Sequence, residues 1–160
     1  MEEPNFLELR IYTENNELKK RYQEVMTLHN YRYHTDNNQP YLGFPLFTPI
    51  NDEVSPDGRT LVNLQIKCRM IRHTYTNTNI NTNASPYYLY PSINISTLSL
   101  ANSIGIINSG YMGDVNAIFD NNRQDPISID IFSQLVQICA PSLEPFMVSL
   151  IDTMDDLLLI

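Results

Sequence analysis

The chain lacks any long uninterrupted apolar run. Its 160 residues are 42% hydrophobic, but no apolar segment approaches the roughly 20 residues that a membrane-spanning helix needs. Glu2 and Glu3 stand near the amino terminus where a secretory signal would carry basic residues before a hydrophobic stretch. We therefore expect no membrane partner and a cytoplasmic or other intracellular location.

Cysteine is scarce as well. The two cysteines, Cys68 and Cys139, each stand among apolar neighbours in the sequence. Two reduced core thiols of an intracellular protein explain this pattern better than a disulfide or a metal pair.

Basic residues are few, and they are absent from most of the second half. The net charge is −8 and the isoelectric point is near 4.7. Beyond His73, Arg123 is the only basic residue. A negative chain repels a phosphate backbone, which disfavours nucleic acid as a partner. The second half also offers little that could hold a triphosphate.

The patterns of metal and nucleophile sites are missing. His29, His34 and His73 have no metal-ligand spacing relative to one another or to the cysteines. No Gly-rich phosphate loop and no Ser/His/Asp arrangement stands out. Acidic residues at 152, 155 and 156 resemble a calcium cluster, but the apolar residues 157–160 that follow favour a terminal segment that packs on a neighbour or in a groove.

The pattern that is present is mostly that of short strands. Residues 7–12 alternate with period two, and a helix with apolar positions at Leu18, Tyr22, Val25 and His29 follows them. Residues 30–40 are polar and turn-rich, residues 62–70 alternate as one clear strand, and the Thr/Asn-rich residues 74–83 predict a mobile surface loop. Residues 55–58, Ser-Pro-Asp-Gly, predict a turn in which the glycine supplies a positive φ. Further strands are expected at 87–90, 97–101, 104–107, 114–119, 127–132, 135–140 and 146–151.

These elements predict one all-β domain over residues 1–160, an antiparallel sandwich or a distorted jelly-roll-like barrel with one N-terminal helix. Residues 1–40 hold the first strand and the helix, residues 41–151 form the β core, and residues 152–160 are a short tail.

Glycine is rare, and three of the five glycines fall in one segment. Gly105, Gly110 and Gly113 lie between apolar strand residues. Clustered glycines of this kind mark a place where the backbone turns sharply or approaches something closely. From spacing alone, an ordinary β-hairpin is the preferred interpretation.

The same segment, residues 101–115, resembles the third motif of the trimeric dUTPases, a Gly-x-Ile-Asp-x-x-Tyr-x-Gly hairpin. Residues 134–141 with 143–146 resemble the fourth motif of viral members. Residues 43–47, followed by the strand ending at 66–68, resemble the first motif, and residues 89–92 resemble the start of the second more weakly. The motifs stand in family order from about residue 43 to residue 151.

The resemblance implies a homotrimer with sites at the subunit junctions. It also implies that the hairpin backbone reads uracil and that the tyrosine packs under deoxyribose. The residues that match these roles are Gly105, Tyr111, Gly113 and Gln137. They are either a vestigial nucleotide site or residues that hold the hairpin and the subunit packing, and the second interpretation is preferred.

The residues that carry the family's chemistry are replaced. The aspartate that activates water corresponds to Asn108, whose neutral amide cannot accept a proton. The metal-site aspartate corresponds to Pro45, which has no side-chain oxygen for magnesium. Ser92 directly follows Pro91 where the second motif has an arginine, Met112 stands where viral members have arginine, and the tail lacks the Arg- and Gly-rich arm that closes over the γ-phosphate.

We therefore predict a catalytically inactive dUTPase-like protein without bound Mg²⁺ that acts as a homotrimeric structural or interaction module. If the protein is viral, we expect it to be a virion-associated component. The apolar tail is a candidate contact for another protein. Two alternatives stay open: an active dUTP diphosphatase that uses substitute residues, and a protein that binds deoxyuridine nucleotides without hydrolysing them.

Overall fold

The computed structural model describes residues 5–35, 43–92, 98–101 and 105–160, and strands dominate it. The strands are β1 (Phe6–Tyr12), β2 (Gly43–Phe47), β3 (Asp52–Val54), β4 (Arg59–Asn63), β5 (Lys67–Tyr75), β6 (Ile80–Ser85), β7 (Tyr87–Pro91), β8 (Ser99–Leu100), β9 (Gly105–Ile107), β10 (Asn116–Asp120), β11 (Ile127–Ile129), β12 (Gln134–Cys139) and β13 (Met147–Leu150). The helices are α1 (Asn16–Thr35) and α2 (Met154–Leu158). The prediction of an all-β protein with an early helix is confirmed, and α2 is a short second helix that the sequence did not reveal.

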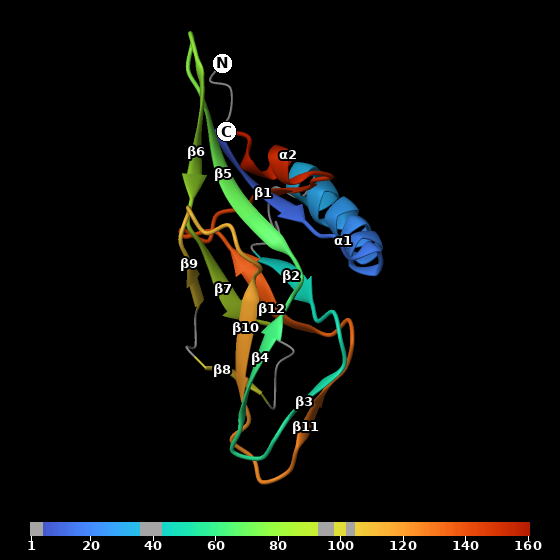
Figure 1. Cartoon of the computed structure of the whole chain (residues 1–160). Helices are drawn as coiled ribbons and strands as arrows, with labels where there is room; N and C mark the ends of the chain where they lie inside the picture. Colours follow the sequence, from blue (N-terminus) through green and yellow to red (C-terminus); the bar gives the residue numbers. More distant parts are fainter. Residues whose placement is uncertain (1–4, 36–42, 93–97, 102–104) are drawn as a thin grey trace.

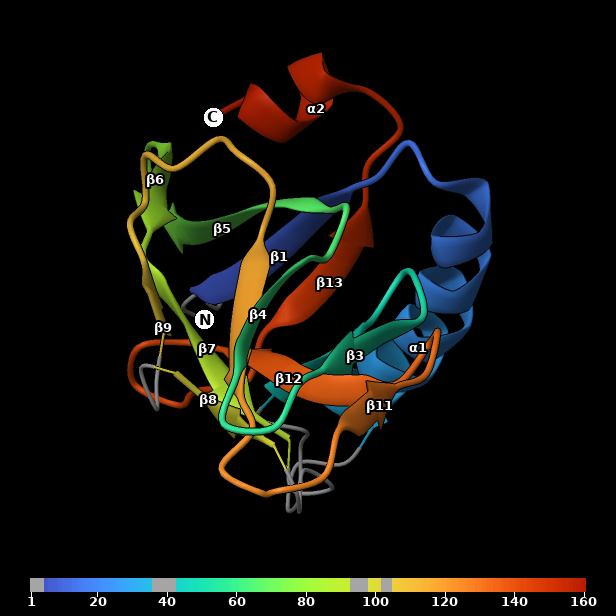
Figure 2. The ribbon, with the colours of Figure 1, turned by 60° about the horizontal axis from the view of Figure 1, so that its bottom comes forward.

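The described strands pair into sheets of order β13-β1-β5-β6, β2-β12-β7-β9, β4-β10-β8 and β11-β3. The first strand, β1, pairs in parallel with the last, β13, and antiparallel with β5, so the two ends of the chain meet in one sheet. Helix α1 lies on one side of the molecule, and β6, β7 and β9 lie on the other (Figures 1 and 2).

The core follows from the alternation along the strands. In β1, Leu7, Leu9 and Ile11 are fully buried while their neighbours are half-buried, because successive strand side chains point to opposite faces. The largest buried side chains are Tyr22, Phe44, Tyr87, Phe119 and Phe146, so each end of the chain contributes to one cluster.

Helix α1 begins at Asn16, directly after a capping residue, and runs further than expected. The Asn15 Oδ1 atom accepts hydrogen bonds from the backbone N–H groups of Glu17 and Leu18, at 3.1 and 3.2 Å. The prediction that residues 30–40 are turn-rich is wrong up to Thr35, where the helix ends. The Asn30 side chain bonds both the N–H and the C=O of Val148 in β13, which holds this part of the helix against the sheet. Residues 36–40 lie outside the described part.

The predicted single strand over residues 62–70 is wrong as a continuous element. It is divided into β4 and β5, and Gln65 between them has a φ of 56°. The Leu64 N–H donates to the Val115 carbonyl and the Val115 N–H donates to the Ile66 carbonyl, both at 2.9 Å, so this stretch pairs across to the segment before β10. Buried and less buried residues still alternate from residue 62 to residue 70. The alternation of apolar residues in the sequence therefore predicted burial correctly and strand continuity incorrectly.

The predicted loop over residues 74–83 is wrong. Strand β5 continues to Tyr75 and β6 begins at Ile80, and the two pair in unbroken register as a hairpin that extends beyond the body of the molecule (Figure 1). The turn is closed by the Thr76 N–H and hydroxyl, which both donate to the Asn79 carbonyl. Backbone pairing needs no apolar side chains, so a Thr/Asn-rich composition is compatible with a strand.

The turn predicted at residues 55–58 is confirmed, with a different backbone reason. The Gly58 N–H donates to the Ser55 carbonyl at 2.9 Å. The positive φ, 51°, belongs to Asp57, and among the described glycines none has a positive φ.

The remaining strand predictions hold with shifted ends. Strand β8 covers only 99–100 of the predicted 97–101, and β9 begins at Gly105, while Thr97 and Ile104 lie outside the described part. Neither described helix is long and apolar enough to cross a membrane.

Candidate functional site

The glycine-rich segment joins two sheets. Strand β9 pairs with β7, whereas β10 pairs with β4 and β8. Between them the Tyr111 N–H donates to the Asn108 carbonyl at 3.1 Å and closes a tight turn. The turn that the glycines predicted is present, but within the described residues β9 and β10 do not pair as an ordinary hairpin.

Tyr111 and Gly113 form a local contact. The Tyr111 hydroxyl donates to the Asp114 carbonyl at 2.7 Å, and a Cβ atom placed on Gly113 would lie 2.6 Å from the Tyr111 hydroxyl oxygen. A side chain at position 113 would therefore clash with the Tyr111 ring as it lies in this structure. Tyr111 remains 40% exposed, so part of this residue is accessible to solvent.

Asn108 lies at the start of the turn and is exposed. Its carbonyl closes the turn, and its side chain is a neutral amide that carries no ionisable proton acceptor. Gly105 is buried in β9 directly opposite Leu89 of β7.

The strand register brings Pro45 and Gln137 together. Pro45 in β2 lies opposite Gln137 in β12, and Gln137 lies opposite Tyr90 in β7. The Gln137 Nε2 atom donates to the Pro91 carbonyl at 3.2 Å. Gly105 lies opposite Leu89 in β7, and Leu89 lies opposite the buried Ile138 in β12. Gln137 is adjacent to Ile138 along β12 and therefore points to the other face. Gly105 and Gln137 thus belong to opposite faces of one sheet.

The residues at Pro45 do not fit the magnesium ion of the resembled family. The ring of Pro45 has no oxygen, and the amide of its neighbour Gln137 is turned toward Gly43, where a Cβ atom would lie 2.1 Å from the Gln137 Oε1 atom. Magnesium sites are built from carboxylates and phosphate oxygens. Among the described residues, no group of three His, Cys, Asp or Glu side chains is placed to hold a metal ion.

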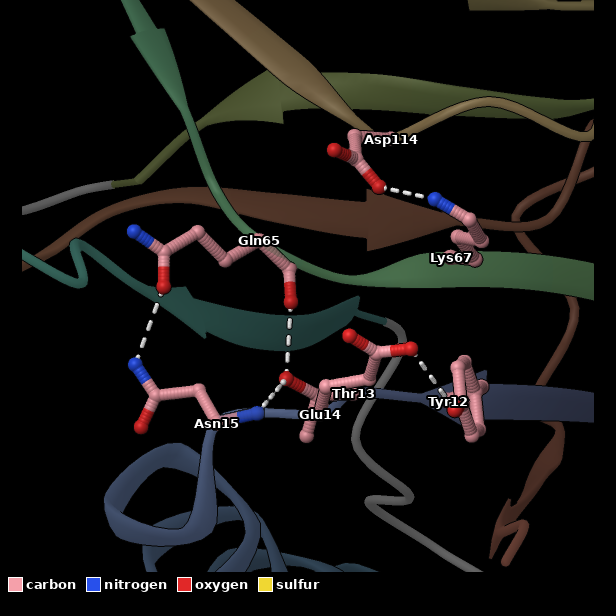
Figure 3. A pocket seen from close by; sticks show the side chains of 7 residues that line it. All are labelled: Tyr12, Thr13, Glu14, Asn15, Gln65, Lys67 and Asp114. Atoms are coloured by element: carbon pink, nitrogen blue, oxygen red, sulfur yellow. Dashed lines mark hydrogen bonds and ion pairs between the residues drawn. The ribbon is translucent and has the colours of Figure 1, made fainter. Parts of the chain in front are cut away.

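The structure also contains a polar pocket that the sequence did not reveal. It has a volume of about 250 Å³ and lies where β1 passes into α1 and β4 passes into β5 (Figure 3). It is lined by Tyr12, Thr13, Glu14, Asn15, Gln65, Lys67 and Asp114. Residues from distant parts of the chain form it, so no local sequence signal could have identified it.

Two of the charges in this pocket, those of Lys67 and Asp114, are paired with each other. The Lys67 ammonium group forms an ion pair with Asp114, and the Asn63 side chain donates to the same carboxylate at 3.0 Å. These hydrogen bonds hold the pKa of the Asp114 carboxyl below its ordinary value. Gln65 is held by Thr13 and Asn15, at 2.7 and 3.0 Å (Figure 3). Asp114 also accepts the Tyr111 hydroxyl through its carbonyl, which connects the pocket to the glycine-rich segment.

The tail folds back onto the chain's own first sheet. Thr153 caps α2 by accepting a hydrogen bond from the Asp156 N–H, and Leu157 is fully buried. Arg10 and Arg69 donate to backbone carbonyls at the end of this helix, Arg69 to that of Leu158 at 2.7 Å. The helix therefore lies against β1 and β5 (Figure 1).

Most basic side chains of the described part are engaged within the chain. Ion pairs join Arg10 to Glu8, Lys19 to Asp152, Arg59 to Asp120, Lys67 to Asp114 and Arg72 to Glu144. The two cysteines are buried and free, and burial raises the pKa of both thiols, that of Cys139 to about 11. Both are therefore protonated at neutral pH and are poor nucleophiles.

No family model matches the chain, and no curated protein matches it. Solved structures resemble it in shape, among them these three. The dUTPase from Streptococcus mutans has a TM-score of 0.49 and 20% identity, over 73% of this chain and 86% of that one. A mutant dUTPase from phage phi11 of S. aureus has a TM-score of 0.49 and 13% identity, over 74% and 86%. The EIAV dUTPase has a TM-score of 0.43 and 17% identity, over 62% and 73%. All three are dUTPases, the family whose motifs the sequence resembles.

Proposed function

We propose that this chain is a non-catalytic dUTPase-like protein that acts as a homotrimeric structural or interaction module. The observation that carries the proposal is the exposed Asn108 at the turn where the resembled family has its general base. An amide can orient a water molecule but cannot deprotonate it. Loss of a positioned base alone lowers a rate by ~10²–10⁴.

Asp114, the carboxylate nearest in sequence to Asn108 among the described residues, is not a good replacement for the base. Asp114 follows the glycine-rich segment, but its carboxylate accepts from Lys67 and Asn63 and its pKa is lowered. A carboxylate stabilised in its ionised form is a weaker proton acceptor than an ordinary one.

The residues around Pro45, Lys67 and α2 also do not favour the binding of a triphosphate and its metal ion. Pro45 and its row offer no carboxylate, and the Lys67 charge is neutralised by Asp114. Helix α2 is fastened to its own chain through Leu157, Arg10 and Arg69, so it serves as packing. Its first turn is acidic and would repel a γ-phosphate.

Self-association and a role as an interaction module complete the proposal. The homotrimer follows from the family resemblance, and exposed Leu158, Leu159 and Ile160 at the end of α2 offer a small apolar contact for another protein. If the chain is viral, a virion component is the corresponding role.

A pyrophosphate-release assay with dUTP and Mg²⁺ tests the loss of catalysis. We expect no turnover above the uncatalysed rate, with an active trimeric dUTPase as positive control. Asn108→Asp should remain inactive, because the metal-site carboxylate and the cationic arm are also replaced. Turnover at a rate ordinary for the family, abolished in Asn108→Ala, would contradict the proposal.

A second candidate is a protein that binds deoxyuridine nucleotides without hydrolysing them. The half-exposed ring of Tyr111, held in place by Asp114 and Gly113, favours it, because such a ring can stack on a sugar or base. Calorimetric titration with dUMP and with a non-hydrolysable dUTP analogue separates the two. Binding that is lost in Tyr111→Ala supports this candidate, and absence of binding leaves the interaction module.

A further inference from the structure

The polar pocket at the junction of β1 and α1 takes no part in the proposed function. Its volume of about 250 Å³ lies below the range of roughly 300–1,000 Å³ that is typical of pockets for drug-sized ligands. It therefore fits a small ligand, about the size of a single sugar ring. In Figure 3, Asp114 and Lys67 lie on one side of the pocket and Glu14 and Tyr12 on the opposite side.

The charges that line the pocket disfavour a charged ligand. Glu14 and Asp114 contribute two carboxylates, and Lys67 contributes one ammonium group. An anion would meet the carboxylates in a chain whose net charge is already −8. A cation would find the Asp114 carboxylate neutralised by Lys67. An uncharged ligand avoids both costs.

The lining places hydrogen-bond donors beside acceptors. The Lys67 and Asp114 side chains are 30% and 35% exposed, so a ligand can reach both partners of the ion pair. A hydroxyl group can donate to the carboxylate and accept from the ammonium group at once. The Gln65 amide oxygen accepts from Asn15 at 3.0 Å, and within the described residues no group accepts from its nitrogen. A ligand with several hydroxyl groups matches this set.

Tyr12 adds an aromatic ring to the polar lining. The residue is half-buried, and its hydroxyl donates to Glu14 at 3.3 Å. An aromatic side chain presents an apolar ring together with a polar end. A pyranose ring has the complementary properties, because it is uncharged, carries several hydroxyl groups and has an apolar face of C–H groups.

The backbone of Gln65 gives an independent reason to regard this pocket as a binding site. Its φ is 56°, a left-handed conformation that favours glycine and costs free energy in glutamine. Strained residues of this kind cluster at ligand sites. The side chain is exposed, so packing in the core does not explain why position 65 carries one. The hydrogen bond with Asn15 is the alternative explanation, and a glycine variant separates the two.

We propose that this pocket binds an uncharged hexose, whose hydroxyl groups bond to Lys67 and Asp114 and whose apolar face lies on Tyr12. The hexose is either a free sugar or the last residue of a glycan, since both present the same ring. The inference goes beyond the proposed function and does not depend on it, because the pocket uses neither Asn108 nor the ring of Tyr111.

Saturation-transfer NMR of the full chain tests the class of ligand. The ligands are D-glucose, D-galactose and D-mannose, the methyl glycoside of each, and putrescine and inorganic phosphate as charged controls. We expect at least one hexose to receive saturation from the protein and to be displaced by neither control. Transfer to the matching methyl glycoside indicates the end of a glycan, and transfer to the free sugar alone indicates a free hexose.

A pair of glycine variants tests the site. Gln65→Gly removes one wall of the pocket and relieves the positive φ, so hexose binding should weaken at least tenfold while the urea midpoint stays equal or rises. Leu143→Gly is the matched control, because Leu143 has a φ of 58°, is 45% exposed and lies outside the pocket. It should relieve the same strain and leave hexose binding unchanged.

Three results would overturn this inference. The first is the absence of transfer to every hexose, or stronger binding of putrescine or phosphate. The second is hexose binding that persists in Gln65→Gly while its urea midpoint falls, which would assign Gln65 to the contact with Asn15. The third is equal loss of binding in Leu143→Gly. Turnover of dUTP, by contrast, would contradict the proposed function and leave the hexose site standing.

Discussion

Gly110 and Gly113 belong to the same segment but lack side chains for different reasons. A Cβ atom at Gly110 would meet nothing within 4 Å, while one at Gly113 would meet the Tyr111 ring. Neither glycine has a positive φ. The Tyr111 hydroxyl lies at the far end of a partly exposed side chain, so it can move away at the cost of its hydrogen bond to Asp114.

Gly113→Ala should therefore destabilise the chain by about 0.5–1.5 kcal/mol, the net value of one hydrogen bond. Gly110→Ala, its matched control, should be neutral or slightly stabilising, since it only restricts the unfolded chain. Urea unfolding measures both. In a Tyr111→Ala background the cost of Gly113→Ala should disappear, and a cost that persists there would show that the ring is not the reason for the glycine.

The family resemblance predicted roles for certain residues, and the structure added what surrounds those positions. The residue types at positions 45 and 108 were visible in the sequence because a residue type is a local fact. The pairing of Lys67 with Asp114 and the alignment of Pro45 with Gln137 were not visible, because they depend on how strands far apart in the sequence align.

At the scale of elements, α2 shows how a short segment is held by few contacts. Isolated helices of this length are unstable in water, and its stability comes from the Thr153 cap, the buried Leu157 and the two arginines at its end. The sequence showed a run of apolar residues there without indicating which of them is buried.

Leu157→Ala should cost about 2–5 kcal/mol in the attachment of α2, as is typical of a fully buried leucine. Leu158→Ala removes the same group from a side chain that is 43% exposed and should have little effect. Limited proteolysis and amide exchange of residues 153–160 report the detachment directly. Equal protection of α2 in the two variants would contradict the assignment of Leu157 as its anchor.

The strand predictions failed in segments where the pairing of the backbone does not follow from the burial of the side chains. Alternation over residues 62–70 reports burial, and it persists through a break at Gln65 because that stretch pairs with the segment before β10. The residues of β6 carry no apolar pattern, yet the backbone of β5 pairs with them. Hydrogen bonds between strands involve the backbone, so their presence is weakly encoded in side-chain type.

At the scale of the whole molecule, the resolved pKa shifts of the carboxyl groups and of His29 are all downward. Burial lowers the pKa of His29, and its hydrogen bond with the Phe146 carbonyl offsets this only in part. Burial raises the pKa of Glu8, but hydrogen bonds from Ser149, His73 and Arg10 outweigh it and the net shift is downward. The ion pair with Arg72 lowers the pKa of Glu144.

The folded state should therefore lose stability in two steps as the pH falls. Below about 6.5, the ordinary pKa of histidine, the unfolded chain binds a proton at His29 that the folded chain resists, so acid favours unfolding. Below about 4.5 the same argument applies to Glu8 and Glu144, whose ionised forms the fold stabilises.

Urea unfolding at a series of pH values, at constant high ionic strength to screen the net charge, measures this. His29→Gln keeps an N–H donor for the Phe146 carbonyl and does not titrate, so it should abolish the first step and keep the second. A wild type whose stability is constant between about pH 7 and pH 5 would contradict the role assigned to His29.

The sequence by itself determined the composition, the alternation that selects core residues, and the residue types at the motif positions, because each of these is a property of the chain read locally. Only the tertiary structure decided that β9 joins β7, that β4 and β5 separate at Gln65, and that α2 packs on β1. These features arise from contacts between residues distant in the sequence, and the free energy of such contacts depends on the geometry of both partners.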